Sequence, residues 1–406
     1  MKKQITTILA VAMAQLGFAQ TSATLYGYVR GEFAFDSRQV VAARDANYID
    51  VVAPVVKDSN GKDLNANPNF NGWGLESRLG VKISGPEFFG MKSDAVLEGH
   101  FFGSTESSIN DLGLRHAYVQ LSNDDVEVLA GQYWHPMFVT NVSPMTYNFN
   151  AGSPFQPFNR SPQVRFSTKG SVRFTGAFLT ELDFKSVGGK AATSGLPAFH
   201  AQLQFGDDNS FVGGFGANYK TLRAGLGEKN FGTFNFLAYA KAKLGENATW
   251  QAYGNYGQNP TELLQLGGVA KIGDEYNSNK TLSLWTEFYG DFTPSFEWGI
   301  FGGYTRDYGF EKGLGMTMPN TIFGITRIYE EPITGEKITK FVSTPISAWR
   351  VSPRLGWKSG NTKLTTELDY TSTTYGKYDE KGASQALKND ATAGNFRVSL
   401  SLIQSF

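Results

Sequence analysis

Seven arginines are the residues of this sequence best suited to chemistry, because most of them alternate with apolar residues along the chain. An arginine fork can hold a carboxylate through two parallel hydrogen bonds, and it stays charged at any physiological pH. Side chains of this kind that converge would recognise small anions. The alternative is that they pair with nearby acids such as Glu32 and Glu76 and only neutralise one another. The arginines are Arg30, Arg78, Arg160, Arg165, Arg173, Arg350 and Arg354.

Catalytic and metal chemistry are not indicated. The chain has no cysteine, which excludes disulfides, thiolate metal sites and thiol catalysis. It also has no GxSxG, HExxH or P-loop motif. His135 lies between Trp134 and Pro136, where packing is the favoured role. We therefore expect no enzyme activity, no metal and no cofactor. The histidines are His100, His116, His135 and His200.

The elements that must position the arginines are β-strands with two different faces. Successive side chains of a strand point to opposite faces, and a barrel in lipid needs apolar residues outside and polar residues inside. Residues 25–36 alternate in this way, with Val29 and Phe33 on one face and Arg30 on the other. The pattern blurs around Arg115 and Gln132, where the sequence does not show which face is inward. It recurs at 75–83, 199–205, 282–291, 349–357, 363–370 and 396–406.

The connections between these segments predict the number of strands. Short turns are expected at 86–91, 123–125, 169–171, 206–209, 245–247, 291–294 and 359–361. Longer loops are expected at 37–72, 105–110, 136–162, 185–196, 223–230, 259–280, 309–345 and 375–394. Together they join sixteen strands, an even number with both ends on one side, as an antiparallel barrel requires. The predicted fold class is all-β, a transmembrane antiparallel barrel of about 16 strands formed by residues 20–406.

The start of the chain predicts export. Lys2 and Lys3 precede an apolar run at 5–14, and Gly17 and Ala19 occupy the positions that a signal peptidase reads. Residues 1–19 are therefore expected to be a cleaved signal peptide. Beyond them, no run approaches the roughly 20 apolar residues of a membrane helix. Basic and acidic residues number 37 each, so no overall field favours nucleic acid as a partner.

The third long connection, 136–162, differs from an ordinary surface loop. It contains several prolines and aromatics, which favour a stiff segment packed against the inner wall over a mobile loop. It has no acidic residue from Pro136 to Asn159, and Arg160 and Arg165 follow it. We expect this loop to fold into the barrel and to form a basic constriction with these arginines, Arg30 and Arg78. The alternative is an outer loop that makes surface or subunit contacts.

Three stretches resemble a known family. They are GQYWHPMF at 131–138, GSPFQPFNRSPQVRF at 152–166 and YGYVRGEFAFDSRQ at 26–39. They resemble the porins of Bacteroidetes-type bacteria, which are related to the DcaP-like porins. The resemblance implies a homotrimer of 16-stranded barrels in the cell outer membrane that passes small solutes, with DcaP-like members favouring dicarboxylates. The expected partners are thus the lipid bilayer, two further copies of the chain and solutes in transit. A non-conducting barrel that serves as a scaffold in a surface assembly is the alternative, and single-channel conductance would separate the two.

Overall fold

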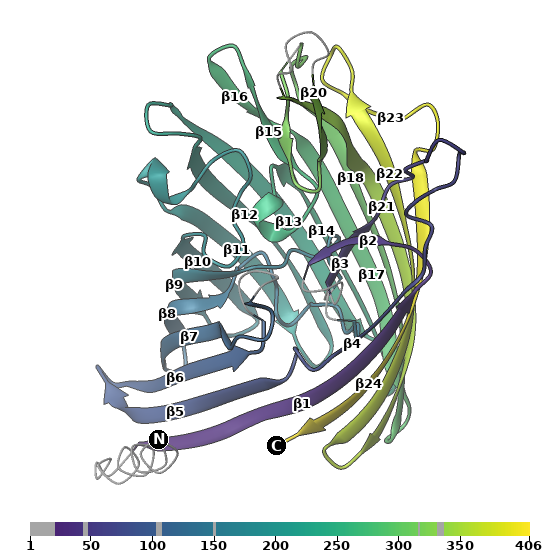
Figure 1. The fold of residues 1–406 in the computed structure, drawn as a ribbon. Helices are drawn as coiled ribbons and strands as arrows, with labels where there is room; N and C mark the ends of the chain where they lie inside the picture. Colours follow the sequence, from purple (N-terminus) through teal and green to yellow (C-terminus); the bar gives the residue numbers. More distant parts are fainter. Residues whose placement is uncertain (1–20, 44–47, 103–107, 149–151, 316, 331–336) are drawn as a thin grey trace, which may run out of the picture.

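The computed structural model describes residues 21–43, 48–102, 108–148, 152–315, 317–330 and 337–406. The expected signal peptide, residues 1–19, lies outside the described residues. Within them, sixteen long strands form one closed antiparallel sheet (Figure 1). The strands are β1 (Ser22–Asp36), β5 (Arg78–Phe88), β6 (Met91–His100), β7 (Gly113–Ser122), β8 (Val126–Trp134), β9 (Arg160–Thr168), β10 (Val172–Leu179), β11 (Ala198–Asp207), β12 (Phe211–Arg223), β13 (Asn230–Lys243), β14 (Ala248–Gln258), β17 (Lys280–Thr293), β18 (Phe296–Gly309), β21 (Lys337–Ser359), β22 (Thr362–Tyr378) and β24 (Thr392–Ser405).

The sheet closes because β1 pairs with both β5 and β24. Its register with β24 runs from Tyr28 opposite Ser405 to Asp36 opposite Arg397. The short turns and both ends of the described chain lie at one end of the barrel, which we call the turn end, and the long loops lie at the other, the loop end (Figure 1). The predicted barrel and its strand number are confirmed. No helix among the described residues is long and apolar enough to cross a membrane.

The loops contain short elements of their own. The expected loop at 309–345 is shorter than predicted, because residues from Lys337 onward belong to β21 and pair with β20. The hairpin β2–β3 contacts the inner face of β22, where the Val52 N–H donates to Thr373 and the Tyr375 hydroxyl donates to the Val52 carbonyl. The loop elements are β2 (Val40–Ala43), β3 (Tyr48–Val52), β4 (Asn69–Trp73), β15 (Gly268–Ile272), β16 (Glu275–Ser278), β19 (Asn320–Thr321), β20 (Ile325–Glu330), β23 (Ser384–Ala386) and the short 3-10 helices η2 (Ala192–Ser194) and η3 (Thr261–Leu263).

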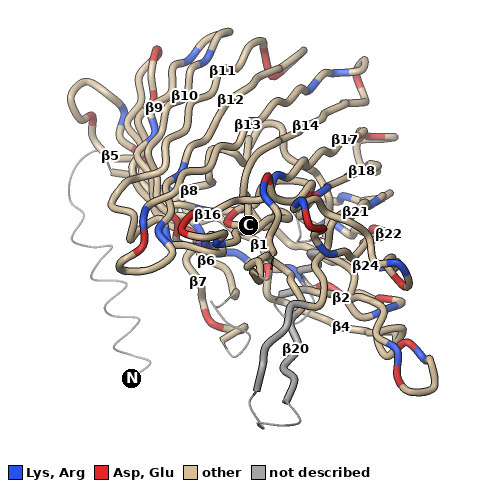
Figure 2. The backbone as a smooth tube through the Cα atoms, turned by 90° about the horizontal axis from the view of Figure 1, so that it is seen from above, with Lys and Arg blue, Asp and Glu red and all other residues tan. Residues whose placement is uncertain are grey.

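The two faces of the wall differ as the alternation predicts. In β1 the outward Val29 is 61% exposed, whereas the adjacent inward Arg30 is 7% exposed. The outward faces of β5, β11, β22 and β24 are likewise apolar, which suits contact with lipid chains. A closed barrel leaves no unpaired strand edge, so its backbone polar groups are satisfied within the sheet. An apolar band around such a barrel places the protein in the outer membrane. Lys and Arg are interspersed with Asp and Glu, so neither sign dominates one side (Figure 2).

A β-bulge explains why the alternation blurs in the fourth strand. In the pairing of β6 with β7, Glu98 lies opposite His116 and Gly99 lies opposite Leu114, which leaves Arg115 without an opposite residue. An extra residue in one strand interrupts the inside–outside alternation, and both Arg115 and His116 are buried. The Gln132 amide in the fifth strand donates to the carbonyls of Leu114 and Arg115, at 3.4 and 3.1 Å. The two positions where the sequence pattern is unclear are therefore the bulge at Arg115 and Gln132 in the adjacent strand, which hydrogen-bonds to it.

Candidate functional site in the barrel lumen

The connection between β8 and β9 runs through the lumen. It leaves the loop end at His135 and reaches the turn end, where the Asn141 amide donates to Asp208 at 2.9 Å. Asp208 belongs to the turn between β11 and β12, so this segment extends along the barrel interior. On its return path, the Ser153 carbonyl accepts a hydrogen bond from Arg350 at 2.8 Å. We call the described residues 136–148 and 152–159 the inner loop.

Carboxylates of the wall hold the first half of the inner loop. The Met145 N–H donates to the Glu287 carboxylate at 3.0 Å, and the Tyr147 N–H donates to Glu367 at 2.6 Å. The Tyr147 hydroxyl also contacts Glu297. Hydrogen bonds to charged acceptors are stronger than neutral ones. On the side of β17, β18 and β22, the acid-free loop therefore contacts wall carboxylates, so this side is not a purely basic surface.

An apolar core inside the barrel holds residues from both halves of the inner loop. Met137 and Phe155 of the inner loop pack with Trp285 of β17 and Phe301 of β18, and all four are buried. The Trp285 indole also donates to the Gln156 side chain at 2.6 Å. Full burial of one such side chain contributes ~1.5–3 kcal/mol relative to exposure. The inner loop is thus fixed to the wall by packing as well as by hydrogen bonds.

Most of the predicted arginines contact a carboxylate. Arg30 pairs with Glu32 at 3.0 Å and also with Glu76, which Arg78 contacts at 3.4 Å. This is the neutralising arrangement that the sequence left open as the alternative. The further pairs are Arg160–Asp183 at 2.6 Å, Arg173–Asp208 at 3.4 Å and Arg354–Glu287 at 2.6 Å.

The arginines do not converge on one point. Arg30 and Arg350 donate to carbonyls of the inner loop, and the Arg354 guanidinium lies 5.7 Å from the ring centroid of Tyr147. These three therefore support the loop from the wall. Arg160 is buried between Asp183 and the Trp134 ring, at the start of β9. Arg165 and Arg173 line one cavity together.

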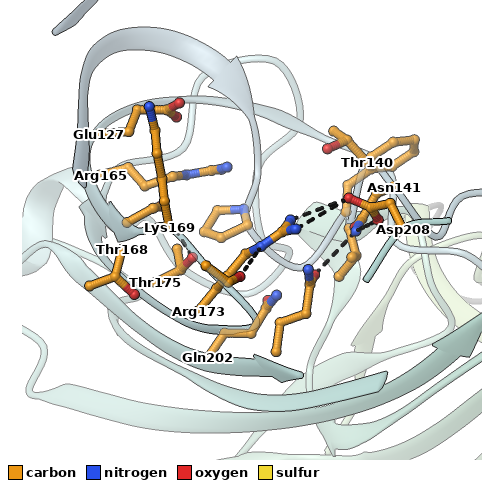
Figure 3. A pocket seen from close by; sticks show the side chains of 16 residues that line it. Glu127, Thr140, Asn141, Arg165, Thr168, Lys169, Arg173, Thr175, Gln202 and Asp208 are labelled. Atoms are coloured by element: carbon orange, nitrogen blue, oxygen red, sulfur yellow. Dashed lines mark hydrogen bonds and ion pairs between the residues drawn. The ribbon is translucent and has the colours of Figure 1, made fainter. Parts of the chain in front are cut away.

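The cavity with Arg165 and Arg173 lies near the turn end, between the inner loop and the strands β8–β11. It measures about 510 Å³, and Lys169, Glu127 and Asp208 also line it (Figure 3). The Arg165 guanidinium donates to the Gln163 side chain and to the Trp134 carbonyl. Within the described part of the chain it forms no ion pair with a carboxylate. Figure 3 shows Arg165 extended into the cavity, with Arg173 turned toward Asp208.

The acids of this cavity do not cancel its basic residues. Burial raises the pKa of the Asp208 carboxyl, but hydrogen bonds from Asn141 and the charge of Arg173 outweigh burial, so the pKa lies below its ordinary value. The Asp208 carboxylate is therefore ionised at neutral pH, and it accepts hydrogen bonds from Asn141 and Arg173. Three cations against two carboxylates leave an excess of one positive charge. A low-dielectric passage focuses such an excess on a permeating ion.

Sequence reasoning missed two clusters. A second cavity of about 300 Å³ is lined by Arg78 together with Arg115, whose inward orientation depends on the bulge. A buried ion pair joins Lys220 of β12 to Glu262 of η3, and Lys220 also donates to Ser186 at 2.7 Å. No local pattern identifies this pair, because its partners come from a strand and two separate loops.

Comparisons with known proteins agree with this architecture. No family model and no curated protein sequence matches the chain. Among solved structures, the outer membrane channel DcaP of Acinetobacter baumannii is similar, with a TM-score of 0.69 and 18% identity over 95% of this chain and 97% of that chain. The anion-selective porin from Comamonas acidovorans has a TM-score of 0.56 and 12% identity over 95% of this chain and 100% of that one. OmpF of Salmonella typhi has a TM-score of 0.53 and 10% identity, covering 95% and 97%. These likenesses are to the fold, and they show that the chain has the fold of outer-membrane porins.

Proposed function

We propose that the chain is a diffusion porin that passes small hydrophilic solutes and favours small anions such as carboxylates. The observation that carries the proposal is the Arg165 cavity. Three cations line it, and Arg165 extends into it without a carboxylate partner in the described chain. An arginine without a carboxylate partner can bind a passing carboxylate in place of water. Because its hydrogen bonds to Gln163 and Trp134 already satisfy part of the guanidinium, binding is expected to be weak enough for release.

The reversal potential across a salt gradient in a planar bilayer tests the anion preference. Replacing Arg165 with glutamate changes the cavity by two unit charges. At roughly 7 Å in water this disfavours chloride and favours potassium by about 1.2 kcal/mol each, so the ratio of chloride to potassium permeability changes by about 2.4 kcal/mol, or roughly fiftyfold. We expect wild-type protein to be anion-selective and Arg165→Glu to lower the ratio by about this factor.

Arg306→Glu is the matched control, because it makes the same change in charge outside the lumen. Arg306 is exposed on β18 between the buried, inward Thr305 and Asp307, and its guanidinium lies 5.5 Å from the ring centroid of Tyr308. The Arg306→Glu substitution should leave the ratio of chloride to potassium permeability close to the wild-type value. Cation selectivity of the wild type, or equal effects of the two substitutions, would show that the basic cavity does not select the permeating ion.

A scaffold role is the second candidate, because of the packing inside the lumen. The inner loop and residues 263–266 bury apolar side chains between the walls, which narrows the interior. A folded, membrane-inserted protein that gives no channel events would favour the scaffold. Stepwise conductance increments would favour the porin.

The remaining expectations from sequence are part of the same proposal. We infer that the barrel acts as a homotrimer, that residues 1–19 are removed on export, and that the protein is related to the porins of Bacteroidetes-type bacteria. The resemblance of the sequence to the DcaP-like porins implies dicarboxylates as candidate solutes. The constriction would then consist of Arg165 and Arg173 on the wall, with Arg30, Arg350 and Arg354 holding the inner loop opposite them.

A further inference from the structure

A second cavity lies on the wall formed by β1 and β5–β8, and its lining differs from that of the Arg165 cavity. It measures about 300 Å³. Three cations line it, Arg78, Lys82 and Arg115, against a single carboxylate, Glu98. Arg165 lies 5.3 Å from the ring centroid of Tyr133, which lines the second cavity, so the two cavities are near each other.

The buried Arg115, which borders this cavity, retains an unpaired hydrogen-bond donor. Its Nε donates to Glu98 at 2.6 Å, and its guanidinium lies 5.5 Å from the ring centroid of Trp134. Arg115 is 1% exposed, yet its Nη1 has no hydrogen-bond partner among the described residues. A buried donor without an acceptor is unfavourable, and most donors of this kind in proteins are satisfied. The unpaired nitrogen is enclosed behind the cavity lining, so the Arg115 cation favours an anionic group in the adjoining cavity.

Aromatic side chains form the rest of the lining. Tyr118 and Tyr133 lie with their ring centroids 4.9 Å apart at an angle of 66°. Both are half-buried, so part of each ring faces the cavity. The Tyr26 hydroxyl donates to Glu98 at 3.1 Å, which leaves lone pairs of the carboxylate for further donors. Tyrosine offers an apolar face and a polar tip, and the cavity presents several of both.

We propose that this cavity binds sugar acids of the hexuronate class during transit. A hexuronate carries a carboxylate for Arg115, Lys82 and Arg78, a ring with apolar C–H groups for the tyrosine faces, and hydroxyls that can donate to Glu98. An aromatic acid would leave the remaining lone pairs of Glu98 without further donors, a neutral sugar would leave Lys82 without a carboxylate partner among the described residues, and a short carboxylate would leave the rings uncovered. The inference rests on the proposed porin function, since it names a solute class for the same lumen.

Saturation-transfer NMR on the detergent-folded protein measures this binding without any current through the barrel. Glucuronate, glucose, acetate and benzoate are titrated separately, and we expect glucuronate to have the lowest dissociation constant. Lys82→Gln should weaken glucuronate binding about threefold to fivefold, as expected for a partly solvated charge contact. Tyr118→Leu should weaken it about threefold to tenfold, whereas Tyr118→Phe, which keeps the ring, should retain most of the affinity.

Arg306→Gln serves as the control outside the lumen, and the heat-dependent gel mobility of each variant checks that the barrel is folded. The inference is overturned if benzoate or acetate binds as tightly as glucuronate, or if folded Lys82→Gln and Tyr118→Leu bind glucuronate like the wild type. Bilayer conductance tests the porin function separately. A conducting barrel without glucuronate preference contradicts only this inference, whereas a barrel that binds glucuronate but carries no current contradicts the porin function.

Discussion

The buried pair of Lys220 and Glu262 should be the most sensitive point of the loop architecture. Their side chains are 2% and 1% exposed. The Lys220 ammonium contacts Glu262 and also donates to Ser186 and to the Asn259 carbonyl, both at 2.7 Å. The Val187 N–H donates to Thr261 at 3.0 Å. One ammonium group thus joins strand β12 to the loop after β10 and to the loop after β14.

We expect Lys220→Met to lower the free energy of unfolding by ~3–5 kcal/mol, because it leaves the Glu262 carboxylate buried without its cation. The double variant Lys220→Met/Glu262→Leu should regain most of this loss, since both charges are then removed and the site becomes apolar. Guanidinium-induced unfolding in phospholipid vesicles, followed by tryptophan fluorescence, gives both values. Glu275→Gln is the control, because it breaks the exposed pair with Lys312, and it should have no measurable effect.

Two results would refute this reasoning. A Lys220→Met protein as stable as the wild type would show that the pair does not hold the loops. A double variant as unstable as the single variant would show that the loss comes from packing around the lysine side chain and not from an unpaired charge.

Two further predictions concern the lipid face and the assembly. Val398 points outward on β24, is 47% exposed and lies opposite Phe35 of β1. Val398→Arg should lower the free energy of unfolding by ~2–4 kcal/mol at the bilayer midplane and by less toward the membrane surface. The unfolding assay described above measures this change. The buried inward neighbour, Ser399, should accept asparagine with a smaller loss, and equal effects would argue against a lipid-facing Val398. Native mass measurement in mild detergent should give three copies of the chain, and a monomer at all protein concentrations would contradict the trimer.

The fold was predictable from sequence because each strand lies between two different solvents. Successive side chains of β1 point alternately to lipid and to the lumen, which places Val29 and Arg30 on opposite faces. The same alternation holds along β22 and β24. The short turns and long loops then set the strand number without any knowledge of distant contacts. The stiff composition of residues 136–162 also predicted that they fold inward, because proline and aromatic residues are unsuited to a mobile surface loop.

The candidate site depended on contacts that no local pattern contains. Sequence could place Arg30 and Arg165 inside the barrel, but it could not show that Arg30 is held by Glu32 and Glu76 while Arg165 extends into a cavity without a carboxylate partner in the described chain. Which acid reaches which arginine depends on strand register and on the path of the inner loop, and both are set by residues far apart in the chain. Arg115 faces the lumen because of a β-bulge. The alternation of residue types could not predict this orientation, because one extra residue reverses the inside–outside pattern at that point. The sequence by itself therefore determined the barrel and its two faces, whereas only the tertiary structure decided which charges remain available inside it.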